Sequence, residues 1–144
     1  MSLTTLDIAR ALQIALSTDS DVRAVLGDVP RLYDYLPEDP LFPYLTYGPM
    51  RTVDIGGDET SLHSHILTLH VWSRYGGRAE AINILRAVTQ VVLTRAFELG
   101  YIHLVRRQIL YSDIFRAPDG RTLHGLLRLS FTTDSTALIS QEAS

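Results

Sequence analysis

Two histidines at alternate positions, His63 and His65, are the residues whose types and spacing best suit chemistry. On an extended strand, side chains two residues apart point to the same face, so these imidazoles would lie side by side. A zinc site normally needs three or four protein ligands, so the pair lacks a partner. The nearest acids, Asp58 and Glu59, fall in a predicted loop. The pair leaves open a small metal-dependent enzyme or metal-binding domain, but structural or surface histidines explain it more simply.

Three further histidines could each act as a general base: His70, His103 and His124. None lies in a sequence context that pairs a nucleophile with its base. Arg106 and Arg107 are adjacent on a predicted strand, so they point to opposite faces and cannot clamp one phosphate. The glycine pairs at 56–57 and 76–77 lack the spacing of a phosphate-binding loop. The sequence therefore predicts no catalytic residue, no cofactor and no metal.

The first half of the chain predicts two helices and two strands. A stripe of apolar residues over 4–17 predicts a helix, and Asp19-Ser20 caps a shorter one that Gly27 ends. Residues 31–35 predict a short strand. Pro43 can begin a strand, so 44–47 predicts another. Glycine, proline and acidic residues over 48–60 predict a loop of about a dozen residues.

The second half predicts a long strand over 62–74 and a helix over 78–98, followed by strands over 102–115 and 121–133. Leu67, Leu69 and Val71 predict the buried face of the first strand. Ala117-Pro118-Asp119-Gly120 is typical of a hairpin turn. We expect an α+β fold: a single antiparallel sheet of four to five strands, with N-terminal helices and one long helix on one face. Residues 1–144 form one domain, with a flexible tail over 134–144.

Composition narrows the class of protein. A net charge of −3 argues against a protein that mainly grips nucleic acid. The chain has no cysteine, and all thirteen of its basic residues are arginine. No apolar run is long enough for a membrane span, and the N-terminus lacks the pattern of a secretion signal. We therefore expect a soluble protein that is made in the cytoplasm and has no membrane partner.

Several short motifs occur in the order found in one known family. They are Arg31-Leu32-Tyr33-Asp34, Pro43-Tyr44-Leu45, the strand from His65 to Ser73, Glu80-Ala81 at the start of a helix, and Asp119-Gly120-Arg121-Thr122-Leu123-His124. Their order resembles the siphophage tail-completion or tail-terminator family, whose members join tail to head. Leu45 stands where the family more often has valine. A neighbouring family of head–tail connectors, with similar size and organisation, is an alternative.

The resemblance implies a non-enzymatic virion protein of a phage, a prophage remnant or a gene transfer agent. It implies a homo-hexameric ring that binds the tail tube protein and the head-side connector, with DNA passing through the lumen without sequence-specific contacts. A small ligand-binding regulatory domain is a further alternative. Trp72 is either a peripheral core residue or an interface anchor, since tryptophan and arginine are enriched at interface hot spots. The interface candidates are Trp72, Arg74, Arg51, Asp58, Glu59 and Arg128.

Overall fold

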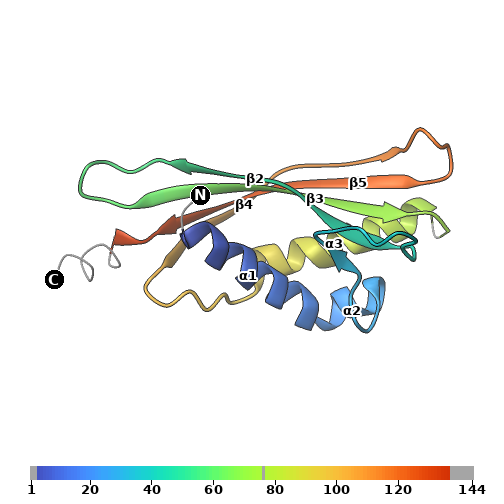
Figure 1. Ribbon diagram of the computed structural model, residues 1–144, viewed down its shortest axis with the longest axis horizontal. Helices are drawn as coiled ribbons and strands as arrows, with labels where there is room; N and C mark the ends of the chain where they lie inside the picture. Colours follow the sequence, from blue (N-terminus) through green and yellow to red (C-terminus); the bar gives the residue numbers. More distant parts are fainter. Residues whose placement is uncertain (1–2, 76, 137–144) are drawn as a thin grey trace.

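Among the residues that the structure describes, three helices pack on one face of a five-stranded sheet (Figure 1). The structure, a computed structural model, describes residues 3–75 and 77–136. In chain order the elements are α1 (Leu3–Thr18), α2 (Ser20–Leu26), β1 (Leu32–Tyr33), β2 (Tyr44–Asp54), β3 (Leu62–Ser73), α3 (Gly77–Thr94), β4 (His103–Arg116) and β5 (Leu123–Asp134). Gly76 and the predicted tail over 137–144 lie outside the described residues.

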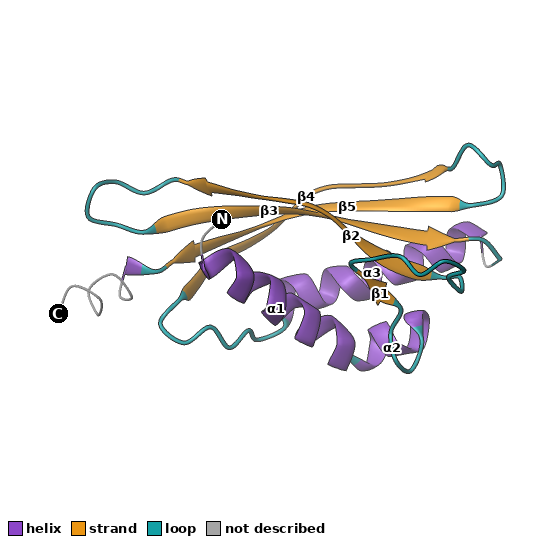
Figure 2. Ribbon diagram, viewed as in Figure 1, coloured by secondary structure: helices purple, strands orange, loops and turns teal. Residues whose placement is uncertain are grey.

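The sheet has the strand order β1-β2-β3-β5-β4. β2, β3, β5 and β4 pair antiparallel, and only the short β1 pairs parallel, with Leu45 and Thr46 of β2. The Pro-rich segment between β1 and β2 brings the chain back to the end of the sheet where β1 begins. β1 and β2 therefore run in the same direction. The loops of the β2–β3 and β4–β5 hairpins project at opposite ends (Figure 2). The predicted α+β class and strand number are confirmed.

The core lies between the sheet and the helices. Leu67, Leu69 and Val71 of β3 are buried as predicted, and they share one cluster with Val88 of α3. Gly125 of β5 allows this close packing, because a Cβ there would lie 3.3 Å from Leu85 Cδ1 and from Val71 Cβ. The opposite face of the sheet carries no helix among the described residues (Figure 1).

The predicted loop over 48–60 is wrong for its first half. β2 continues to Asp54, and its register against β3 shifts between Tyr47 and Met50. Gly48 and Pro49 therefore form a bulge inside the strand, and pairing with the long β3 overrides their weak strand propensity. Only residues 55–61 connect the two strands.

The predicted end of the long helix is also wrong, because α3 stops at Thr94. Arg95 instead binds Asp19 at 3.1 Å, next to the start of α2. Arg107 of β4 donates to the Val92 carbonyl at 3.3 Å, where a cation stabilises the C-terminus of a helix. The buried residues of α3 are Ala81, Ile84, Leu85, Ala87, Val88, Val91 and Val92.

The start of the predicted flexible tail is held in place. Asp134 belongs to β5, and the Ser135 N–H donates to the Ser61 carbonyl at 2.9 Å. The two serine hydroxyls are also 2.7 Å apart and buried. These hydrogen bonds tie the first residues of the predicted tail to Ser61, next to the start of β3.

Candidate assembly surface

The face of the sheet that no helix covers carries a row of rings. Tyr44 pairs with Trp72, Trp72 with His124, and His124 with Phe115, so four neighbouring strands each contribute one residue at the same level. We call Tyr44, Trp72, His124 and Phe115 the aromatic row. Cross-strand aromatic pairs stabilise a sheet by about 0.2–1 kcal/mol each. The row therefore fixes its own side chains before any partner binds.

Trp72 is the centre of the aromatic row. Its ring stacks on His124 with centroids 4.0 Å apart and planes at 18°, and on Tyr44 at 6.3 Å. The indole N–H donates to Thr46 Oγ1 at 3.0 Å. Trp72 is half-buried and lies outside the hydrophobic core cluster. Its polar atom is satisfied within the subunit, so a partner would not need to supply a hydrogen-bond acceptor for it.

His70 and His124 form a hydrogen-bonded pair beside the row. His70 Nδ1 and His124 Nε2 lie 2.7 Å apart, so one ring donates its N–H to the other. Burial lowers the pKa of both imidazoles, and the neighbouring His70 lowers that of His124 further. Gly48 faces the pair, because a Cβ there would lie 2.8 Å from His70 Nε2. These histidines are neutral, partly buried groups that complete the sheet face.

Arg74 directly follows the last residue of β3 and lies near the aromatic row. Its guanidinium lies 4.2 Å from the Phe42 ring centroid, donates to Thr122 Oγ1 at 3.2 Å and pairs with Asp119 at 3.4 Å. Hydrogen bonds from Thr122 lower the pKa of Asp119, and Arg74 adds to this effect. Arg74 thus joins β3 to the β4–β5 hairpin, next to Trp72.

The six predicted interface residues do not form one cluster. Arg51 and Arg128 are exposed on the uncovered face, opposite Ile66 and Thr68 of β3. Asp58 and Glu59 are exposed at the tip of the β2–β3 hairpin, at the end of the sheet remote from Trp72 and Arg74 (Figure 1). Four candidates therefore share the uncovered face, and two lie at its far end.

His63 and His65 lie on the helix side of the sheet. His65 is fully buried, with Nε2 2.8 Å from Thr133 Oγ1 and Nδ1 3.1 Å from Thr52 Oγ1. Burial, helped by His63, lowers the pKa of His65 to about 4. In residues 3–75 and 77–136, no three His, Cys, Asp or Glu side chains gather where they could hold a metal ion. The His65 ring works as a neutral bridge between strands.

The other predicted chemical groups are dispersed. His103 is exposed at the start of β4. Arg106 is exposed, whereas Arg107 turns to the helix side and places its guanidinium 5.0 Å from the Phe97 ring centroid, so the two point apart as predicted. The described helices include none with the length and apolar character to cross a membrane.

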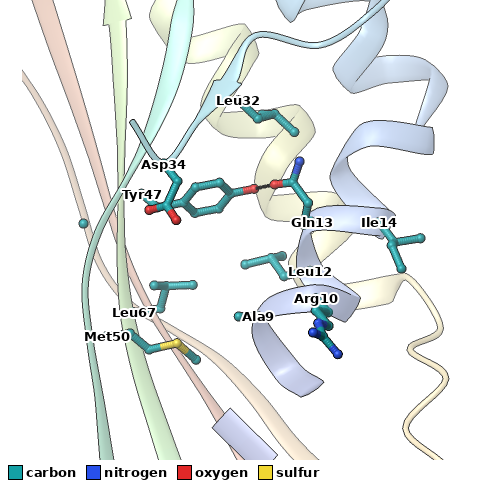
Figure 3. Close-up of a pocket in the computed structure, with 11 residues that line it drawn as sticks. Ala9, Arg10, Leu12, Gln13, Ile14, Leu32, Asp34, Tyr47, Met50 and Leu67 are labelled. Carbon is teal, nitrogen blue, oxygen red and sulfur yellow. Dashed lines mark hydrogen bonds between the residues drawn. The ribbon is translucent and has the colours of Figure 1, made fainter. Parts of the chain in front are cut away.

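A groove between α1 and β2 was not predicted from the sequence. It has a volume of about 520 Å³ and is lined by residues of both elements, including Gln13, Ile14, Tyr47 and Met50 (Figure 3). Tyr47 and Gln13 are hydrogen-bonded across it, and burial followed by the Asp34 charge raises the pKa of Tyr47. The predicted loop over 48–60 concealed this groove, because its β2 wall continues through that segment.

Comparison with known proteins identifies a family and two solved structures with a similar fold. The pattern of one protein family, described as "Tail completion protein gp17", matches residues 10–134. Among solved structures, a chain of the "Virion of native gene transfer agent (GTA) particle" is similar with a TM-score of 0.82 and 20% identity, covering 93% of this chain and 99% of that one. The "Structure of bacteriophage SPP1 gp17 protein" is similar with a TM-score of 0.65 and 18% identity, covering 91% of each chain.

Curated proteins gave no match. The two similar structures establish the fold. The family pattern begins within α1, at residue 10, and ends two residues before the last described residue. This agrees with the resemblance seen in the order of the sequence motifs. The chain belongs to the tail completion protein gp17 family.

Proposed function

We propose that this protein is a structural subunit of a phage tail or gene transfer agent, and that six copies form a ring on the tail tube. The ring ends growth of the tube and receives the head-side connector. Membership of the tail completion family supports the role in the tail. The six-membered ring and its binding to the tail tube protein and the head-side connector are our proposal.

The observation that carries this proposal is the uncovered sheet face. A helix-on-sheet domain needs only one buried face, yet the other face here carries Trp72 and the exposed Phe115 beside the exposed Arg128, with Tyr44 buried under them in the same row. Aromatic and arginine side chains are the types enriched at protein interfaces. Because the aromatic row is already packed, a partner that covers it orders few new side chains.

Catalysis is not part of the proposed role. Each histidine with a described partner is engaged in a structural contact: His65 with two threonines, and His70 with His124. The net charge of −3 favours a lumen through which DNA passes without tight binding. The acidic hairpin tip with Asp58 and Glu59 then becomes ordered against a neighbouring protein, so hydrogen exchange over 55–61 should slow on assembly.

Analytical ultracentrifugation with the tail tube protein of the same particle tests this function. We expect a six-subunit species, alone or once tube protein is added, and tubes that stop growing when it is present. Metal content measured on the same sample tests the metal-binding alternative. A protein that stays monomeric and does not bind the tube protein would refute the proposal. Stoichiometric zinc that is lost in the His63→Ala/His65→Ala double variant would also refute it.

A further inference from the structure

Two strand edges of the sheet lack a partner within residues 3–75 and 77–136. β4 is the last strand on one side, and β1 covers only Leu45 and Thr46 of β2 on the other. The backbone from Met50 to Asp54 therefore has one free edge, as does all of β4. Natural proteins usually protect such edges, because a free edge readily pairs with another strand.

From this geometry, and building on the ring proposed above, we propose that β4 of one subunit pairs antiparallel with Met50–Asp54 of the next copy. The two segments run in opposite directions and lie at the same height. Val53 is level with Arg106 through the pairs with Ser64 and Thr132 of the intervening strands. Two copies placed side by side in the same orientation would thus continue one sheet without a vertical shift.

Charge favours this order of neighbours. Residues 31–61, which form β1, β2 and the hairpin tip, contain six acids and two arginines, a net charge of −4. Residues 103–121, which form β4 and its turn, contain four arginines and two aspartates, a net charge of +2. Opposite charge on opposite edges attracts unlike edges and repels like ones. The contact is therefore heterologous, which is the type that closes into rings.

Apolar surface also matches across the proposed contact. β4 has register shifts at Val105 and Leu110, and both side chains are exposed, by 60% and 43%. Leu110 follows Ile109, which is level with Met50 through Leu67 and Leu129. Met50 lines the groove between α1 and β2, and the 63% exposed Ile14 forms its other wall (Figure 3). Leu110 of one copy thus lies beside the groove of the next.

Cysteine cross-linking tests the contact directly, because the natural chain contains no cysteine. Val53→Cys and Arg106→Cys proteins are mixed, assembled with tail tube protein and treated with a short thiol cross-linker. We expect covalent dimers from the mixture, and a ladder of up to six subunits from the double variant. The matched control replaces Val53→Cys with Arg78→Cys, which is exposed at the start of α3, and should give no dimer.

A charge exchange gives an independent readout. Val53→Arg should weaken assembly about tenfold, because it places a second arginine level with Arg106, and adding Arg106→Glu should restore at least half of the lost assembly. Leu110→Asp should also weaken it, whereas Val29→Asp, on an 86% exposed valine outside both edges, should not. Rings that form normally yet give no Val53–Arg106 cross-link would overturn the edge pairing and leave the proposed function intact. Monomers under every condition would overturn both.

Discussion

Trp72→Ala is expected to weaken ring formation or tail joining at least tenfold while the subunit stays folded. Truncation of an interface hot spot costs 2 kcal/mol or more, which corresponds to about a thirtyfold loss of affinity. The stability cost should be smaller, about 1–2 kcal/mol, because Trp72 lies outside the hydrophobic core cluster and keeps part of its surface exposed. Sedimentation with tail tube protein and melting followed by circular dichroism measure the two effects separately.

Phe131→Ala is the matched control for this experiment. Phe131 is a fully buried aromatic residue of the core, so its removal should cost about 3–5 kcal/mol. The remaining folded protein should still assemble, because Phe131 points to the helix side. If Trp72→Ala melted as early as Phe131→Ala but assembled normally, Trp72 would be a peripheral core residue and not an interface anchor.

Stability should fall steeply as the pH is lowered from neutral towards 4. The pKa of His65 is about 4 in the folded protein, against an ordinary value of 6.5. As the pH falls through 6.5, the unfolded chain takes up a proton that the folded chain does not, so unfolding becomes more favourable. A difference of this size is worth about 3 kcal/mol, lost between pH 6.5 and 4 and constant below that. Urea unfolding at a series of pH values measures it.

His65→Gln isolates the contribution of this residue. The variant loses some stability at every pH because its hydrogen bonds to Thr52 and Thr133 change. Its acid-dependent loss should nevertheless be about 3 kcal/mol smaller than that of the natural protein, since glutamine does not titrate. Parallel curves for the natural protein and His65→Gln would show that His65 is not a buried neutral group.

Periodicity predicted the elements that are long and regular. The alternation over β3, the turn at Asp119-Gly120 and the capping of α2 by Asp19 are local signals, and each leads to the observed structure. The sequence predicted that the strand ends at Tyr47, because Gly48 and Pro49 have weak strand propensity. In the structure they form a bulge inside β2, which pairing with β3 holds in place. That pairing joins residues far apart in sequence, so no local pattern reports it.

The candidate surface was partly predictable. The sequence predicted Trp72 and Arg74 as interface residues, and the structure adds the neighbours of Trp72 on the uncovered face: Tyr44, His124 and Phe115 from three other strands. Such a row depends on the register of three strand pairs, which the sequence alone does not determine. The groove against α1 and the free edge of β2 were missed for the same reason, because both require β2 to continue beyond Tyr47.

The most direct test of the central claim is electron microscopy of particles from a producing strain that lacks this gene. The tail-completion role predicts full heads and separate tails, with tubes of uncontrolled length, and joined particles once the natural gene is supplied. The Trp72→Ala gene should restore joining only weakly, and the Val29→Asp gene fully. Normally joined particles with tails of uniform length in the absence of the gene would contradict this role.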